Sequence, residues 1–201
     1  MEIQTIVFFG KSGAGKGTQS EQVIEFLRKE DPQRRTFYVE TGDLLRKFTG
    51  RKELYSARLV EEVLSEGGLL PEFIPVWAWS GSLIENARED EHLVFDGVSR
   101  REAEAPILAD AIKFFRRKDP KVVLINVSDE WARARLLERG RHDDTDEKIR
   151  ERHGWFRENV EPAINFFRNN PDFHFIEVNG EQEIAKVHEE IMKKISAKKG
   201  Q

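Results

Sequence analysis

Short apolar runs separated by longer amphipathic stretches follow one another along this chain. Five such runs occur, at residues 3–9, 37–39, 93–95, 122–127 and 173–178. Their β-branched and aromatic side chains predict buried strands. The stretches between them place apolar residues at helical spacing, as Val23, Ile24 and Leu27 do after the first strand, and predict helices. Strands that alternate with helices predict a parallel sheet, because a crossover must return the chain to the same edge.

The segments after the second strand follow the same periodicity. Thr41, Gly42 and Asp43 offer capping groups ahead of the next helix. Helices are expected at 54–66, 73–89 and 184–195, and two helices broken at 140–144 are expected within 130–170. The pattern predicts an α/β fold of three layers, a five-stranded parallel sheet flanked by helices on both faces. We interpret residues 1–201 as one domain.

The composition excludes several classes of chemistry. The chain has no cysteine, which excludes disulfides, thiolate metal sites and cysteine nucleophiles. A net charge of −4 argues against a nucleic-acid partner, whose binding needs a basic face. No apolar run is long enough to span a bilayer, and the first strand begins too early for a targeting segment to precede it. We therefore expect a cytoplasmic protein with neither a membrane nor a nucleic-acid partner.

A glycine-rich segment connects the first predicted strand to the first helix. It reads Gly10-Lys11-Ser12-Gly13-Ala14-Gly15-Lys16-Gly17-Thr18. Glycines allow a tight turn and close approach of phosphate oxygens, while successive backbone N–H groups and the positive helix end form an anion cradle. The Lys16 ammonium can reach the outer phosphates, and Thr18 is the expected hydroxyl beside Mg²⁺. The expected ATP-binding residues of this loop are Gly13, Ala14, Gly15, Lys16, Gly17 and Thr18.

One departure from the general phosphate-loop motif is informative. The motif places a serine or threonine directly after the lysine, but here Gly17 stands between Lys16 and Thr18. Gly-Ala-Gly-Lys-Gly-Thr-Gln resembles the adenylate kinase form of the loop. The resemblance to short nucleoside monophosphate kinases continues in order along nearly the whole chain. It implies one P-loop kinase domain with an acceptor-binding helical excursion at about 41–89 and a lid at about 140–144.

Two segments of the excursion carry the resemblance on the acceptor side. Thr41-Gly42-Asp43-Leu44-Leu45-Arg46 resembles the family segment whose threonine and arginine hold the acceptor monophosphate. Gly67-Gly68-Leu69-Leu70-Pro71 resembles the loop that borders the acceptor base, although an ordinary helix-ending loop explains it nearly as well. The resemblance assigns acceptor binding to Thr41, Gly42, Arg46, Leu70, Gly97, Arg100, Glu104, Arg141 and Arg152.

A further segment follows the third strand. Asp96-Gly97-Val98-Ser99-Arg100 resembles the family's Asp-Gly-Phe-Pro-Arg. The resemblance implies that Asp96, with Thr18, helps to hold Mg²⁺ through water and that Arg100 binds the acceptor phosphate. An aspartate at the carboxyl end of a strand beside the phosphate loop fits Mg²⁺ chemistry independently. Ser99 replaces a proline that fixes the backbone of this turn.

Glu104 is the larger departure. It falls where adenylate kinases carry a glutamine that reads the acceptor adenine through one donor and one acceptor. An ionised carboxylate can only accept hydrogen bonds. It could accept from the exocyclic amino group of adenine or cytosine, but its charge would face the adjacent ring nitrogen unless a proton is shared. CMP is therefore a rival to AMP as the acceptor.

The segment that resembles the lid is rich in arginine. In the family such arginines surround the donor base and the transferring phosphates, and the equivalent residues here, with their aspartates, are Arg135, Arg139, Arg141, Asp143, Asp144 and Arg152. Gly140 leads straight to Arg141, so this lid is shorter than that of short-form relatives. Gly180 matches the family's loop beside the donor adenine. The resemblance assigns ATP binding also to Arg135, Arg139 and Gly180, and catalysis to Lys16, Arg100, Arg135, Arg141 and Arg152.

The remaining polar and aromatic candidates have ordinary explanations. Surface or packing roles are expected for the scattered histidines, which are His92, His142, His153, His174 and His188. Trp77 and Trp79 point to different faces of one helix, so one core ring and one partly exposed ring are expected. A solvated helical face is expected for Arg133, Arg150 and Arg157. The Lys-Lys-Gly-Gln end of the chain is expected to fray.

The resemblance implies a monomeric kinase that transfers the γ-phosphoryl group of MgATP to a nucleoside monophosphate, with AMP expected (ATP + AMP = 2 ADP). Such transfer needs in-line placement and charge neutralisation rather than a covalent protein intermediate. The alternatives are a CMP/UMP-type kinase, another small-molecule P-loop kinase, and a nucleotide-binding module with little transfer activity. Ser99, Glu104 and the short lid motivate the last. A regulatory GTPase is disfavoured because no Asn-Lys-x-Asp segment follows a late strand.

Overall fold

A single parallel sheet forms the centre of the molecule. The computed structural model describes residues 1–140 and 144–197. Within them the strands are β1 Thr5–Phe9, β2 Thr36–Glu40, β3 His92–Asp96, β4 Lys121–Asn126 and β5 His174–Asn179. They form a five-stranded sheet in the order β2-β3-β1-β4-β5, with each neighbouring pair parallel. The predicted α/β fold is confirmed.

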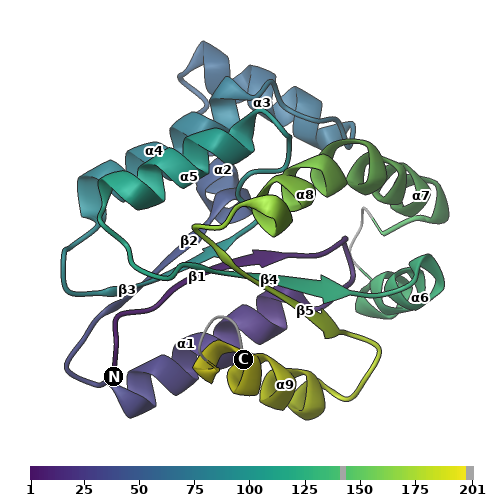
Figure 1. The fold of residues 1–201 in the computed structure, drawn as a ribbon. Coiled ribbons are helices and arrows are strands. Elements are labelled where there is room, and N and C mark those ends of the chain that lie inside the picture. Colours follow the sequence, from purple (N-terminus) through teal and green to yellow (C-terminus); the bar gives the residue numbers. More distant parts are fainter. Residues whose placement is uncertain (141–143, 198–201) are drawn as a thin grey trace.

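Helices cover both faces of this sheet. Their bounds are α1 Lys16–Glu30, α2 Thr41–Thr49, α3 Tyr55–Ser65, α4 Phe73–Asn86, α5 Glu104–Phe114, α6 Asp129–Arg139, α7 Asp146–Trp155, α8 Glu161–Asn169 and α9 Ile184–Ser196. In Figure 1, α1 and α9 lie below the sheet, whereas α4, α5 and α8 lie above it. The three predicted layers are therefore present.

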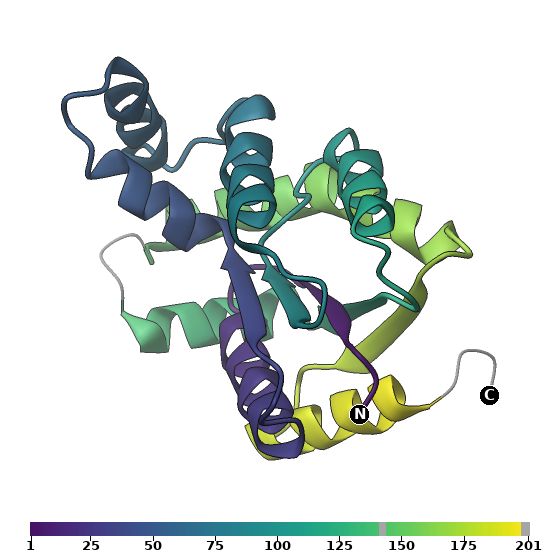
Figure 2. The same cartoon turned by 90° about the vertical axis from the view of Figure 1, so that its left-hand side faces the viewer.

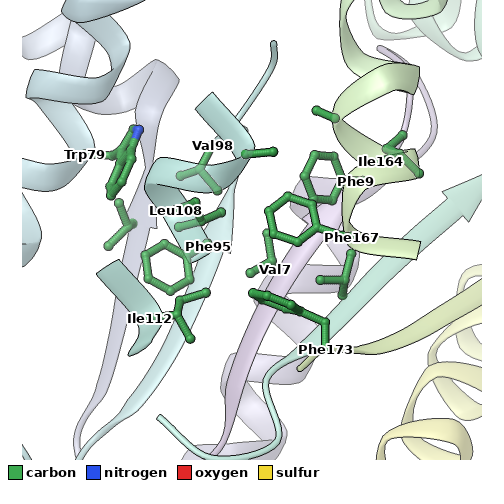
Figure 3. Packing of buried hydrophobic residues seen from close by; sticks show 14 of the residues in the cluster. Val7, Phe9, Trp79, Phe95, Val98, Leu108, Ile112, Ile164, Phe167 and Phe173 are labelled. Atoms are coloured by element: carbon green, nitrogen blue, oxygen red, sulfur yellow. The ribbon is translucent and has the colours of Figure 1, made fainter. Parts of the chain in front are cut away.

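The two faces of each strand explain why there are two helical layers. On β1, Val7 and Phe9 contribute to one buried cluster. Ile6 and Phe8 contribute to the other. Successive strand side chains point to opposite faces, so a strand buried on both sides reads as an unbroken apolar run. Figure 3 shows the first cluster, in which the rings of Phe9 and Phe167 lie 5.6 Å apart between centroids.

The strand order brings chemically important loops to one edge of the sheet. β1 lies between β3 and β4, and Phe8, next to the last residue of β1, pairs with Asp96 at the end of β3. Loops that follow parallel strands emerge at the same edge, where open α/β sheets bind ligands. The glycine-rich loop after β1 and the segment after β3 therefore start side by side.

Helices α2 and α3 project from the core, as Figure 2 shows at upper left. A small separate cluster of buried residues joins α2, α3, α4 and the segment before α4, namely Leu45, Val60, Leu70 and Ala78. The expected capping of α2 by Thr41 was wrong, since α2 begins at Thr41 itself and Glu40 occupies the N-cap. The reason is that β2 passes into α2 without an intervening loop.

The helical region 130–170 is broken between α6 and α7, as predicted, but its second part is not one regular helix. A π-helical turn, η1 Phe156–Val160, joins α7 to α8. Pro162 lies in the first turn of α8, and proline has no N–H with which to continue a regular helical ladder. The apolar spacing alone did not reveal this change of helix type.

Most of the side chains for which only a packing role was expected have that role in the structure. Trp79 is fully buried and Trp77 is 48% exposed, as predicted. His92 is buried, and its Nδ1 accepts the Gln4 N–H at 3.0 Å. The end of the chain expected to fray lies outside the described residues, and so does His142. In the described ranges, no helix combines the length and apolar character needed to cross a membrane.

Candidate functional site

The loop after β1 has a backbone that requires glycine at particular positions. Gly13 and Gly15 have φ values of 90° and 88°, which favour glycine. A Cβ on Gly13 would lie 2.4 Å from the carbonyl oxygen of Ala132, so the loop packs directly against α6. Helix α1 then begins at Lys16, and the N–H groups of its first turn have no partner within the helix. The arrangement is a cradle for an anion.

The Lys16 side chain folds back onto the loop that forms this cradle. Its Nζ donates to the carbonyl oxygens of Gly10 at 2.7 Å and Lys11 at 3.2 Å. Burial lowers the pKa of the Lys16 ammonium; the charge of Asp96 opposes this, while Arg100 and Arg139 add to it. These charges come from residues 96–100 and from α6, so three predicted site residues act on the Lys16 ammonium. The ammonium can exchange its carbonyl partners for an anionic ligand.

Asp96 ends β3 beside this loop and is 8% exposed. Burial raises the pKa of its carboxyl, and the charges of Lys16 and Arg100 oppose that effect. Tyr38 was not predicted as a site residue, but its hydroxyl lies 3.5 Å from Asp96 Oδ2 and 3.3 Å from Ser20 Oγ. Burial and Asp96 raise the pKa of the Tyr38 phenol. No sequence motif marks Tyr38, because it reads as an ordinary strand residue.

A small pocket next to the loop joins residues that are distant in the sequence. Its lining includes Ala14, Gly15, Thr18, Gln19, Arg135, Gly180, Gln182, Ile184 and Val187. Five of these residues belong to the predicted ATP-binding set, whereas Gln19, Gln182, Ile184 and Val187 were not predicted. A Cβ on Gly180 would lie 2.6 Å from side-chain atoms of Ile125 and Val127. Only glycine therefore fits at this position, where the backbone after β5 passes close to the end of β4.

The arginines next to the predicted lid are held by a buried aspartate. Arg139 donates two hydrogen bonds to Asp144, at 2.9 and 2.8 Å, and Arg152 donates one at 2.9 Å. The Asp144 side chain is fully buried between them. Two-point pairing fixes the plane of the Arg139 guanidinium group. Arg152 is held between Asp144 and the Lys148 carbonyl oxygen, to which its Nε donates at 3.2 Å. Arg141 and Asp143 lie outside the described residues.

The predicted acceptor residues are only partly assembled. Arg46 is 60% exposed and donates to Glu40 at 3.0 Å, which turns its side chain back toward the start of α2. Arg100 is exposed and its Nε donates to the Gly97 carbonyl oxygen at 3.2 Å. The buried hydroxyl of Thr41 has no hydrogen-bond partner among the described residues. A buried polar group without a partner is costly unless a ligand or water satisfies it.

The oxygen donors at this edge suit one kind of metal ion. Thr18 is exposed on the first turn of α1, and Asp96 lies across from Lys16. A hydroxyl and a carboxylate are hard oxygen ligands of the kind that Mg²⁺ takes together with waters and substrate phosphates. No group of three or more His, Asp or Glu side chains that could hold a metal occurs among the residues described. The residues present fit a Mg²⁺ that is held mainly by its nucleotide.

The chain is similar to known proteins along most of its length. A model of the adenylate kinase family matches residues 8–171. The adenylate kinase of Flavobacterium psychrophilum is 34% identical over 93% of this chain and 97% of its own length. Adenylate kinase 1 of a Nostoc species is 28% identical over 92% of this chain and 95% of its own. The Thermus thermophilus adenylate kinase is 31% identical over 82% of this chain and 83% of its own.

The chain belongs to the adenylate kinase family. It is a nucleoside monophosphate kinase, a phosphotransferase with ATP as the phosphoryl donor. The family membership explains why the phosphate loop, the segment after β3 and the arginine-rich helices appear together and in this order.

The turn after β3 departs from the adenylate kinase pattern in its backbone as well as its sequence. Ser99 has a φ of 54° and is 1% exposed. Proline is fixed near −65° and cannot adopt that angle. The turn of this chain therefore differs in shape from one with proline at this position. The buried Ser99 Oγ has no hydrogen-bond partner among the described residues.

A charged cluster that the adenylate kinase motifs did not indicate ties the phosphate loop to α6 and α7. Lys11 Nζ lies 2.5 Å from Asp129 Oδ1, and Arg157 donates to Asp129 Oδ2 at 2.6 Å. His153, 4% exposed, lies with Nε2 3.3 Å from the Ser12 carbonyl oxygen and with Nδ1 3.7 Å from Asp129 Oδ1. Burial lowers the pKa of His153, and Asp129 opposes this. Arg157, expected on a solvated face, is exposed but reaches across to α6.

Proposed function

We propose that this enzyme transfers the γ-phosphoryl group of MgATP to AMP, forming two molecules of ADP. The observation that carries the proposal is the convergence at Lys16, where the charges of Asp96, Arg100 and Arg139 act on one ammonium group. Together with Lys16 these residues come from three segments, namely the loop after β1, residues 96–100 and α6, and each was expected to touch a phosphate or its metal. Transfer of a phosphoryl group needs this kind of positioning and charge neutralisation.

The donor nucleotide would occupy the loop and the pocket beside it. Its phosphates would take the N–H groups at the start of α1 and would replace the carbonyl oxygens as partners of Lys16. The adenine would lie in the pocket lined by Arg135 and Gly180. Thr18 and Asp96 would hold Mg²⁺, Asp96 through water. When bound, the ion would neutralise charge on the donor phosphates.

The acceptor would enter from the side of α2. Its phosphate would meet Arg100 and draw Arg46 away from Glu40, and its polar atoms would satisfy the buried Thr41 hydroxyl. Gly42, Leu70, Gly97 and Glu104 would border it. Arg139 and Arg152, already oriented by Asp144, would cover the transferring group together with Arg135 and Arg141. No general base is required in this scheme.

The test is a transfer assay with MgATP and each of AMP, CMP, UMP, GMP and dTMP in turn. Lys16→Ala should lower the rate at least about a hundredfold, because it removes a charge that stabilises the transition state. The matched control is Lys29→Ala, an exposed lysine on the last turn of the same helix, which should leave the rate unchanged. Circular dichroism of all three proteins verifies that they are folded.

The other outcomes of this assay are informative. Transfer chiefly to CMP or UMP would support kinase activity but would contradict the proposal that AMP is the acceptor. ATP binding without transfer that depends on Lys16 would indicate a nucleotide-binding module. The monomeric state and the cytoplasmic location stay predictions, which sedimentation analysis and cell fractionation test.

A further inference from the structure

Glu104 is a buried carboxyl at the acceptor end of the molecule. It is the first residue of α5 and is 1% exposed. Its Oε2 accepts the backbone N–H of Arg100 at 2.9 Å. No hydrogen bond to Oε1 occurs among the described residues. One carboxyl oxygen is thus anchored by the turn after β3, and the other is available to a ligand.

The charged groups around Glu104 are engaged elsewhere. Arg100 turns its Nε to the carbonyl oxygen of Gly97 at 3.2 Å. Arg101 donates to the Leu70 carbonyl oxygen at 3.3 Å and lies 3.9 Å from Glu72 at the start of α4. Within residues 1–140 and 144–197, no lysine, arginine or histidine forms an ion pair with Glu104. Glu72 adds a like charge on the side of α4.

A buried carboxyl without an ion pair favours its neutral form, because burial removes the water that would stabilise the negative charge. Burial accordingly raises the pKa of Glu104, against the smaller opposing effects of the Arg100 N–H group and of the Arg100 and Arg101 charges. Carboxylic acids held neutral in this way can donate a hydrogen bond. Glu104 has the environment for that behaviour.

The neighbouring segments place Glu104 where an acceptor base would be read. Arg100 connects it to the turn after β3, and Arg101 connects that turn to Leu70 in the excursion. A polar ligand edge at this place would meet Glu104 Oε1.

We propose that Glu104 reads the acceptor base as a neutral carboxylic acid. The Oε1–H group donates to a ring nitrogen, and Oε2, which accepts the Arg100 N–H with one lone pair, accepts from an exocyclic amino group with the other. This inference rests on the proposed function, in which the acceptor is a nucleoside monophosphate. A neutral carboxyl offers one donor and one acceptor, the pattern of an amide, and matches the amino and ring-nitrogen edge of adenine. Ionisation leaves two acceptors.

The two protonation states therefore favour different bases. The edge of guanine presents an N1–H and an N2 amino group, two adjacent donors that an ionised carboxylate can accept. The adenine ring nitrogen would instead face a second acceptor and lose its hydrogen bond. Loss of the Glu104 proton should weaken the binding of AMP relative to the binding of GMP. Acceptor choice in this enzyme is thus linked to pH through one side chain.

The experiment compares the wild type with Glu104→Gln, which keeps the shape and offers one donor and one acceptor at every pH. KM and kcat are measured for AMP and GMP at saturating MgATP from pH 5.5 to 9. In the wild type the AMP KM should rise by up to about tenfold per pH unit above the Glu104 transition, with little change in kcat. In Glu104→Gln the AMP KM should change only with the titration of the substrate phosphates. That titration affects both proteins equally.

A second measurement keeps the test independent of turnover. Calorimetric titration of AMP in buffers with different ionisation enthalpies counts the protons taken up on binding. Above the transition the wild type should take up close to one proton more than Glu104→Gln. Equal proton uptake and parallel KM profiles in the wild type and Glu104→Gln would overturn the inference about Glu104 but would not contradict the proposed kinase activity. Absence of AMP transfer by both proteins at every pH would instead overturn the proposed function.

Discussion

Lys11 Nζ and Asp129 Oδ1 lie 2.5 Å apart, so the phosphate loop is joined to the first turn of α6 by a charged hydrogen bond. Asp129 also accepts from Arg157, and a change in α6 or η1 therefore reaches the loop directly. A double-mutant cycle with Lys11→Met and Asp129→Asn should give a coupling energy of about 1 kcal/mol, since Asp129 is 42% exposed and solvent screens the pair.

The same pair should persist over a wide pH range. The hydrogen bond from Lys11 holds the pKa of Asp129 below its usual value of 3.8. A depressed carboxyl pKa contributes stability that is present above 3.8 and is lost only as the pH falls through the lower, folded-state value. The coupling measured by urea unfolding should be equal at pH 5 and pH 8. The exposed Arg133–Asp146 pair is the control and should couple more weakly; equal values for the two pairs would contradict a special role for Lys11.

Ser99→Pro, which restores the residue type of the family pattern, should destabilise this enzyme by about 3 kcal/mol, because proline cannot reach a φ of 54°. Ser99→Gly should change the free energy of unfolding by less than about 1 kcal/mol, since glycine adopts this angle freely. Both values come from urea denaturation. A stable Ser99→Pro protein would mean that the turn can rearrange without cost.

Asp144→Asn should lower both stability and transfer rate. It removes the buried negative charge between Arg139 and Arg152 and should cost about 3 kcal/mol, the usual effect of breaking a buried ion pair. The transfer rate should fall more than the affinity for ATP, because the two arginines lose their orientation. Asp110→Asn, an exposed aspartate on α5, is the matched control. An unchanged rate in folded Asp144→Asn would separate Asp144 from catalysis.

Glu104→Gln should be more stable than the wild type at high pH. The folded-state pKa of Glu104 lies above its usual value of 4.5, so the folded protein holds the proton more tightly than the unfolded chain. Stability of the wild type then decreases as the pH rises from 4.5 through the folded-state pKa. The difference in unfolding free energy between the two proteins should grow over that interval and then level off. A difference that is constant with pH would contradict the burial effect.

Much of the fold could be predicted from the sequence because its strongest signals are local. An apolar run buried on both faces identifies β1, and the glycines of the following loop are required by φ values that only they adopt easily. The helix expected at 184–195 matches α9 almost to the residue. Such features depend on periodicity and backbone preference, which a sequence shows directly.

The unpredicted features arise from contacts between distant segments. Tyr38 reaches Asp96 only because β2 lies beside β3, and His153 reaches Ser12 only because α7 packs over the loop. The π-helical turn before Pro162 is likewise a local rearrangement that apolar spacing does not record. For the acceptor site, motif resemblance located the segments, but the left-handed Ser99 and the anchoring of Glu104 required the structure.

The central place of β1 constrains how this protein can be synthesised. Thr5 pairs with Leu93 and Ile6 with Lys121, so β1 leaves the ribosome well before β3, which ends at Asp96, and β4, which begins at Lys121. At translation rates of about 5–20 residues per second, that interval is on the order of ten seconds. During it the most apolar strand is exposed to chaperones and to aggregation. Nucleotide can bind and assist folding only after β3 and β4 have arrived.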